Sequence, residues 1–215
     1  MTKSLKRIAF VITLGTLASK VGGLTRQLVI AGAFGVGAAY DAYNYAYVLP
    51  GFFLVLLGGI NGPFHNAIVS VCSRKSKKES AYILSSINTL VSTLLIIITG
   101  IIFFAADPLI NIIGPGLSND IHRLAVIQLQ VMAPIALLSG LIGLGFGSLN
   151  AAKIFFIPAI SPLFSSIVLT LLVGAFWLLE GSAIQSKQLE LKGGIILALA
   201  TLIGALLQWI IQLPL

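Results

Sequence analysis

The chain has 215 residues, of which 58% are hydrophobic and only 9% are charged, and its formal net charge is +7. A soluble globular domain has roughly 25% charged residues, so this composition excludes a soluble fold. Repeated apolar runs of about 20 residues have the length of membrane-crossing helices and lack the alternation of barrel strands. The sequence therefore predicts an all-α, polytopic integral membrane protein.

Hydropathy predicts one transmembrane domain over residues 1–215, with six membrane-spanning helices. The second span is expected to bend or unwind near residues 58–63, because glycines and a proline cluster there. In the fourth span, Gly143 and Gly147 have the spacing of a close helix contact. The six spans are expected at about residues 8–34, 43–70, 83–105, 121–148, 157–179 and 195–213.

Two connections between the spans have informative sequences. Residues 106–120 hold turn signals around an apolar centre, which predicts a short helix at the membrane surface. Residues 180–194 are polar with balanced charge, and they are expected to form an exposed loop. The chain ends directly after the sixth span, and we expect it to be the N-terminal part of a longer protein.

The 13 Lys and Arg residues are unevenly distributed between the two ends of the spans. If the N-terminus is cytoplasmic, eight of them lie on the cytoplasmic side and three outside, together with five of the six acidic residues. The positive-inside rule then predicts cytoplasmic N- and C-termini. The basic loop at 73–80 is expected to fix this topology and contact anionic lipid, and no soluble basic domain for nucleic acid is present. The cytoplasmic set is Lys3, Lys6, Arg7, Arg74, Lys75, Lys77, Lys78 and Lys153.

Two cations, Lys20 and Arg26, lie inside the first apolar run. A cation at mid-membrane costs about 3 kcal/mol on insertion scales, so it usually faces a polar interior. The two are about 120° apart around a helix and flank a face of small and hydroxylated residues. Such a face can hold a phosphate or pyrophosphate. Alternatively, Lys20 extends to the membrane surface, and Arg26 caps carbonyls or pairs with a carboxylate.

The second span begins with an acid among four tyrosines, in the run 40–47. Tyrosines are typical of the membrane interface, and most of these are expected to be interfacial. Asp41 is a candidate N-cap for the helix that follows or a counter-ion for a cation on the first helix. These two roles are compatible.

Asn61, His65 and Asn66 surround the expected break in the second span. Polar groups at a broken membrane helix are often part of a transport site or gate, so Asn61 and His65 are candidate substrate-binding residues. The alternative is that they lie at the end of the span and contact lipid headgroups.

Catalytic and metal-binding patterns are missing from the sequence. The single cysteine, Cys72, excludes an internal disulfide, and the two histidines, His65 and His122, are far apart in the chain. There is no Ser/His/Asp arrangement, HExxH motif or phosphate-binding glycine loop. The sequence therefore predicts neither an enzyme nor a cofactor or metal site.

Several motifs, in order along the chain, resemble the N-terminal part of the MurJ/MviN lipid II flippases, a family of the multidrug/oligosaccharidyl-lipid/polysaccharide exporter superfamily. The run 19–26 looks like the family's S-[RK]-x-x-G-x-x-R element, with its cations at Lys20 and Arg26. The run DAYNYAYVLP, which begins at Asp41, is similar to D-A-F-x-x-A-F-R-[IL]-P, and residues 132–164 resemble the fourth and fifth helices. The chain departs from the family at Val48, where an arginine is usual, and over 51–68, where the family has a basic stretch with a glutamate.

The resemblance implies a two-lobed fold of 14 membrane helices in a bacterial inner membrane, with the six spans here forming most of one lobe. It also implies export of an undecaprenyl-pyrophosphate-linked peptidoglycan precursor to the outer leaflet by alternating access. Lys20, Arg26 and Asp41 match residues of the family's central cavity. Partners would be the lipid-linked precursor, membrane lipids and cell-wall synthesis proteins. Two rival functions are a non-transporting membrane scaffold and an exporter of another amphiphile on the same fold.

Overall fold

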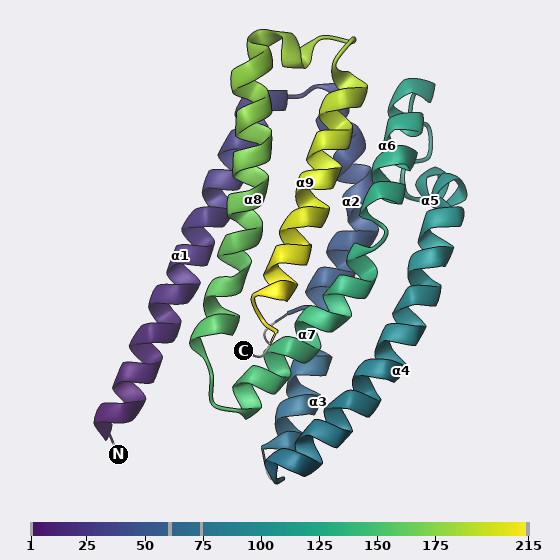
Figure 1. Cartoon of the computed structure of the whole chain (residues 1–215). Coiled ribbons are helices and arrows are strands. Elements are labelled where there is room, and N and C mark those ends of the chain that lie inside the picture. The colour runs from purple at the N-terminus through teal and green to yellow at the C-terminus, as the bar shows by residue number, and fades with distance from the viewer. Residues whose placement is uncertain (1, 60–61, 74, 214–215) are drawn as a thin grey trace.

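The computed structural model describes residues 2–59, 62–73 and 75–213. These residues form nine α-helices and one 3-10 helix, with no strand among them (Figure 1). The chain is therefore all-helical, as its composition predicts. The helices are α1 (Thr2–Phe34), α2 (Ala38–Leu56), α3 (Pro63–Cys72), α4 (Lys77–Phe104), α5 (Ala106–Ile113), α6 (Asn119–Met132), α7 (Ile135–Ala151), α8 (Phe156–Glu180), η1 (Gly181–Gln185) and α9 (Glu190–Ile210).

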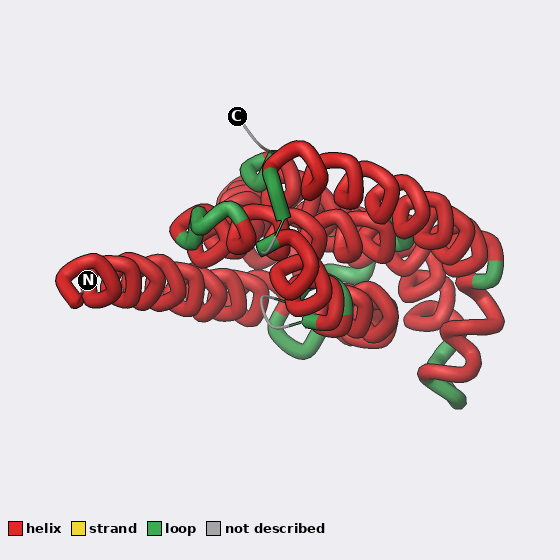
Figure 2. Tube along the Cα trace, turned by 90° about the horizontal axis from the view of Figure 1, so that it is seen from below, coloured by secondary structure: helices red, strands yellow, loops and turns green. Residues whose placement is uncertain are grey.

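The helices form an elongated bundle in which α1 and α4 are at opposite edges (Figure 1). Helix α1 packs mainly against α8, α8 packs against α9, and α2 packs against α6. Helix α7 contacts α3 and α4. Seen from below, the beginning of α1 projects away from the other helices (Figure 2). One long face of α1 is therefore free of other helices.

Four helical segments are long and apolar enough to cross a membrane, among the residues that the structure describes. The third and sixth expected spans, 83–105 and 195–213, correspond to the segments Lys78–Phe104 and Glu190–Ile210. The fourth and fifth, 121–148 and 157–179, correspond to Asn119–Ala151 and Phe156–Gln185. The chain thus has the helices of a polytopic membrane protein.

Two of the expected spans are each divided between two helices. The second ends as α2 at Leu56 and begins again as α3 at Pro63, with Gly62 as the extended N-cap residue. This break confirms the one predicted near residues 58–63. The fourth is divided between Met132 and Ile135, because Pro134 has no N–H to continue the α6 ladder.

Much of the segment 180–194 is exposed, as expected, but most of it is helical and not a loop. Residues Gly181–Gln185 form a 3-10 helix, and α9 already begins at Glu190. The physical reason is Ile184, which is only 1% exposed and anchors this polar segment in the core. By contrast, α5 confirms the short helix expected within 106–120, since Ala106 and Ile110 bury its apolar side.

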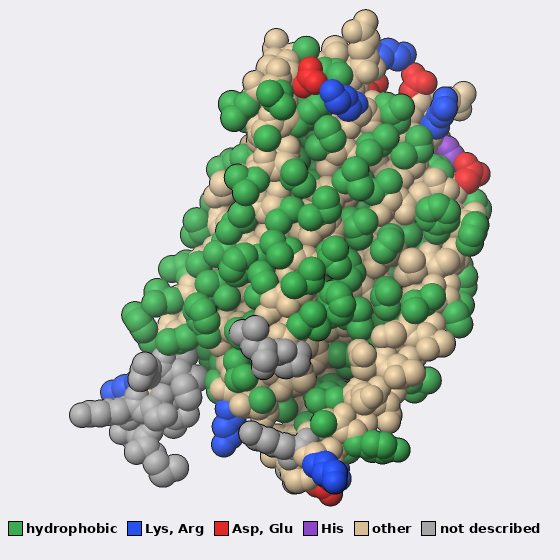
Figure 3. Space-filling model, viewed as in Figure 1, with side chains coloured by type: hydrophobic (Ala, Val, Ile, Leu, Met, Phe, Trp, Pro, Cys, Tyr) green, Lys and Arg blue, Asp and Glu red, His purple; other side chains and the backbone are tan. Residues whose placement is uncertain are grey.

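The two ends of the bundle differ in charge (Figure 3). The end near the start of α1 holds the α3–α4 and α7–α8 connections, which contain Lys75 and Lys153, and the first turn of α4, which contains Lys78 (Figure 1). Arg74 lies outside the described residues. At the other end, acidic residues pair with lysines: Lys187 is 3.1 Å from Asp120, and Lys192 is 2.8 Å from Glu180. The hydrogen bond and charge of Asp120 raise the pKa of the exposed Lys187 ammonium. The basic end is the one expected in the cytoplasm.

A capping box starts α4 at the basic end. The Ser76 hydroxyl accepts a hydrogen bond from the Glu79 amide at 3.3 Å, and the Glu79 carboxylate accepts one from the Ser76 amide at 3.0 Å. Removing such a cap costs about 1 kcal/mol. We expect Ser76→Ala to lose roughly this much stability and to increase amide hydrogen exchange in the first turn of α4 only, whereas Ser73→Ala outside the box should change neither.

Candidate functional site

Helix α1 has three faces with different surroundings. Along the first, Gly15 and Gly22 approach α8, and the Ser19 hydroxyl donates to the Ala159 carbonyl oxygen at 2.8 Å. A second face is apolar and exposed, as expected for contact with lipid chains. The third is polar or small, and it is open at Gly23 and reaches α2 at Gln27. The apolar face consists of Phe10, Leu14, Leu17, Val21, Leu24 and Leu28, and the polar face of Thr13, Thr16, Lys20, Gly23 and Gln27.

Lys20 lies at the centre of the polar face of α1, and its side chain is exposed. A Cβ atom on neighbouring Gly23 would meet no atom within 4 Å, so space is open on this side of the helix. One turn further, the Gln27 side-chain amide donates to the Tyr40 hydroxyl of α2 at 2.7 Å. The polar face of α1 therefore continues onto α2.

Arg26 starts from the face of α1 that also holds Ser19 and Gly22. It is half-buried, and its Nε atom is buried without a hydrogen-bond partner among the described residues. Its charge acts on the phenols of Tyr43 and Tyr47, which places the guanidinium near α2. A buried guanidinium N–H with no acceptor is a group that an anionic ligand could satisfy.

The tyrosines of α2 form a stacked row beside this arginine. Ring centroids are 6.3 Å apart for Tyr40 and Tyr43 and 5.4 Å apart for Tyr43 and Tyr47. The Tyr43 hydroxyl is 3.0 Å from the Thr201 hydroxyl of α9. Tyr43 is only 7% exposed, because stacking and this hydrogen bond hold it inside the bundle.

Asp41 lies on the exposed face of α2, together with Asn44 and Val48. The N-cap of α2 is Gly37, so the expectation of Asp41 as the N-cap is wrong. The carboxylate lies instead in the first turn, where the helix dipole favours an acid. Within the described part of the chain it forms no ion pair with Lys20 or Arg26. Val48, 48% exposed, puts an apolar side chain on this face.

His65 lies on α3, and its hydrogen bonds are made away from α1 and α2. Its Nε2 atom is 2.7 Å from the Asn150 amide nitrogen of α7, and its Nδ1 atom is 3.2 Å from the Asn66 carbonyl oxygen. A neutral ring with its proton on Nδ1 would donate to Asn66 and accept from Asn150. His65 thus joins the first turn of α3 to the last turn of α7, while Asn61 lies outside the described residues.

The structure brings together some of the candidate residues and separates others. Lys20 and Arg26 are on α1, and Asp41 is on the helix that the Gln27 hydrogen bond connects to it. Sequence reasoning misses Gln27 and the tyrosine row as site residues, although Gln27 follows Gly23 by about one helical turn and Lys20 by about two. Among the described residues, no group of three His, Cys, Asp or Glu could hold a metal ion. The arrangement offers cations and hydrogen-bond donors to an anion.

The family model described as lipid II flippase MurJ matches residues 30–215. A protein described as a probable lipid II flippase MurJ from a Synechocystis species is 50% identical over 213 residues, which is 99% of this chain and 40% of that protein. The lipid II flippase MurJ of Thermosipho africanus is 30% identical over 168 residues, or 78% of this chain and 34% of that protein.

A solved structure is also similar to the chain. It is the lipid II flippase MurJ in an inward closed conformation, with a TM-score of 0.76 and 27% sequence identity, and the match covers 94% of this chain. The chain covers 40% of that structure, in line with the 40% and 34% covered in the two relatives. The 215 residues therefore span about two fifths of the length of the proteins they match.

Proposed function

The chain belongs to the MurJ family of lipid II flippases, and we propose that it forms the N-terminal part of a flippase for a lipid-linked cell-wall precursor. Its substrate would be an undecaprenyl-pyrophosphate-linked peptidoglycan precursor, carried from the cytoplasmic to the outer leaflet of a bacterial inner membrane. In this proposal six spans form most of one lobe of a 14-helix fold. The further partners would be membrane lipids and cell-wall synthesis proteins.

The observation that carries the proposal is the free polar side of α1 and α2. It presents Lys20 and Gln27, with the half-buried Arg26 near the tyrosine row and its buried Nε–H without an acceptor among the described residues. A pyrophosphate carries several acceptor oxygens and negative charge, which match these donors. Because no described helix covers this side, it is the natural wall of a cavity closed by a second lobe.

Substrate binding would change the balance between inward-open and outward-open states. The cations on α1 would hold the pyrophosphate in the inward-open state, and rocking of the lobes would then expose it to the outer leaflet. A bound substrate can shift such an equilibrium only through different affinities for the two states. Asp41, exposed on α2, would compete with the substrate for a cation and so favour its release. Asn61 and His65 would act at the cytoplasmic break between α2 and α3.

The proposed orientation places both termini in the cytoplasm. The basic end of the bundle holds the start of α1, the α3–α4 connection and the α7–α8 connection (Figure 1). Clustering of these cations at one end supports the orientation through the positive-inside rule. A cysteine introduced at residue 186, at the acidic end, should react with an impermeant thiol reagent from outside the cell, once Cys72 is replaced by alanine.

Complementation tests the proposed function directly. A strain depleted of its own lipid II flippase would receive this 215-residue chain or, in parallel, any longer reading frame that contains it. Rescue by either one supports the proposal. Rescue by the 215-residue chain, without the rest of a longer protein, would show that these helices suffice. If neither frame rescues growth while the protein is present in the membrane, the activity assigned here is wrong, and a scaffold or an exporter of another amphiphile takes its place.

A further inference from the structure

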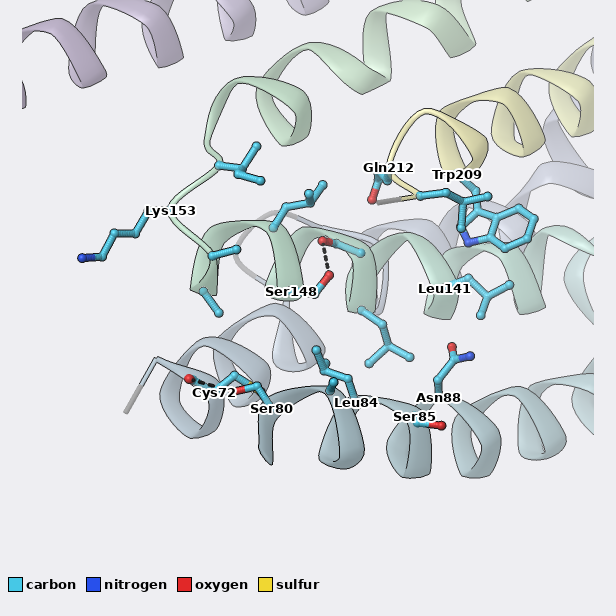
Figure 4. A pocket seen from close by; sticks show the side chains of 18 of the residues that line it. Cys72, Ser80, Leu84, Ser85, Asn88, Leu141, Ser148, Lys153, Trp209 and Gln212 are labelled. Carbon is cyan, nitrogen blue, oxygen red and sulfur yellow. Dashed lines mark hydrogen bonds between the residues drawn. The ribbon is translucent and has the colours of Figure 1, made fainter. Parts of the chain in front are cut away.

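A cavity of about 860 Å³ lies at the basic end of the bundle, away from the polar side of α1. Its walls are the first turns of α4, the second half of α7 and the end of α9 (Figure 4). This volume is within the range of small-molecule sites, about 300–1,000 Å³. None of Lys20, Arg26, Asp41 and His65 lines it, so it is separate from the proposed flippase site.

The cavity is bordered by α4, α7 and the end of α9, and α4 and α7 are in close contact next to it. The two helices touch at Gly140, where a Cβ atom would collide with Leu95 and come within 3.3 Å of Val91. Leu95 is 2% exposed at this crossing. Toward the basic end, Leu84, Ile87 and Val91 of α4 pack against a buried cluster of Ile68, Cys72 and Leu144. The cavity therefore lies alongside these contacts, where α4, α7 and the end of α9 border it.

The lining of the cavity is mainly apolar, with an exposed Asn88 and a buried Gln212 among its polar groups. Leu84, Leu141, Leu144 and Trp209 supply apolar walls. Asn88 points into the space in Figure 4, and it lies 11 residues into α4, about 16 Å along the helix axis. Gln212 is 3% exposed, and its carbonyl oxygen has no hydrogen-bond donor among the described residues. These groups suit an occupant that carries polar atoms on an apolar body.

Two lysines lie where the cavity meets the basic end. Lys75 and Lys153 both line the cavity and are exposed, whereas no acidic residue lines it. Lys153 has a positive φ of 64°, at the turn where the Ile154 amide bonds the Leu149 carbonyl oxygen at 2.8 Å. Glycine is the usual residue in this position, so a lysine there costs about 1 kcal/mol. The strained backbone at Lys153 is consistent with a role for its positive charge at the mouth of the cavity.

We infer that this cavity binds an anionic glycerophospholipid. Its phosphate would be held by Lys75 and Lys153, its ester groups would reach Asn88 and Gln212, and one acyl chain would lie between α4, α7 and α9. Charge complementarity and the apolar walls together select an amphiphile with a negative head, which the cytoplasmic leaflet supplies. The site would anchor the basic end of the bundle in that leaflet independently of flipping.

Trp209 makes the site directly measurable, because the chain has only two tryptophans. The other, Trp177, lies in the last turn of α8, where it packs against Gly32, and it does not line the cavity. The substitution Trp177→Phe therefore leaves Trp209 as the single tryptophan, and it reports on the cavity. The 215-residue chain would be purified in detergent and titrated with phosphatidylglycerol or phosphatidylcholine brominated in the acyl chains. We expect saturable quenching by the anionic lipid, at concentrations about tenfold lower than for the zwitterionic one.

Substitutions at the two lysines separate charge recognition from bulk lipid contact. The double variant Lys75→Gln and Lys153→Gln should lose about tenfold in apparent affinity for the anionic lipid, while Lys78→Gln, exposed at the same end but outside the cavity, should not change it. Lys153→Gly should weaken lipid binding and yet raise the unfolding midpoint by about 2–4 °C, because it relieves the positive φ. A purely structural lysine would not give this opposite pair of effects.

Three results would overturn the inference. Equal, unsaturable quenching by both lipids would show that Trp209 senses only the surrounding detergent and lipid. An absence of quenching would show that the space is closed, for example by chain that follows residue 213. Unchanged lipid preference in the double lysine variant would remove the cations from the site.

Discussion

Replacing Arg26 by glutamine is expected to abolish flipping while leaving the protein folded and in the membrane. The substitution removes the half-buried guanidinium that lies beside Tyr43 and Tyr47 and has a donor without an acceptor. A hydrogen bond to a charged group contributes about 1.5–3 kcal/mol, so affinity for a pyrophosphate should fall by roughly 10-fold to 100-fold. Growth of a flippase-depleted strain and translocation of labelled precursor in vesicles both measure the loss.

The controls for Arg26 distinguish lost recognition from lost charge or lost folding. Arg26→Lys keeps the charge but loses the planar fork, so it should rescue growth only partly. Arg123→Gln removes an exposed cation at the acidic end of the bundle and should transport normally. These variants would be made in the reading frame, short or long, whose unsubstituted form rescues growth of the depleted strain. Normal flipping by Arg26→Gln, at equal protein levels, would exclude Arg26 from the site.

The sequence predicts the helices well because their signals are local. The break between α2 and α3 follows from Pro63 and the glycines before it, and α5 follows from an apolar run between turn residues. The 180–194 segment was predicted wrongly because one buried side chain, Ile184, outweighs the polar residues around it. Burial of a single residue depends on tertiary packing, which local composition does not contain.

The candidate site depends on packing in the same way. Periodicity places Lys20 and Arg26 about 120° apart, but it cannot say which side of α1 meets α8. The contacts of Ser19 and Gly22 with α8 decide that Lys20 lies on the free polar face and Arg26 starts from the packed one. The sequence does not predict the cavity at the basic end, since the cavity depends on how α4, α7 and the end of α9 pack around it.

The second large effect is expected from Gly143→Ala, which should destabilise the bundle by about 3 kcal/mol, at the upper end of the range for overpacking. A Cβ atom at this position would collide with the Leu57 carbonyl oxygen. That atom belongs to the backbone where α2 ends, so it cannot rotate away as a side chain would. The neighbouring contact is also tight: a Cβ atom on Gly147 would be 2.6 Å from Ile68 Cβ. The chain between α2 and α3 would have to move away from α7.

The effect of Gly143→Ala can be measured by labelling the native Cys72, so no cysteine has to be introduced. It is the single cysteine of the chain, and it is 5% exposed. It is the last residue of α3, the helix that follows the backbone segment expected to move. Its reaction with a bulky maleimide, followed during titration with a denaturing detergent, should begin at lower detergent in the variant. Gly100→Ala is the matched control, because a Cβ atom on this α4 glycine meets nothing within 4 Å and alanine favours the helix. If both variants label as the unchanged chain does, the close approach of α7 to Leu57 does not hold the bundle together.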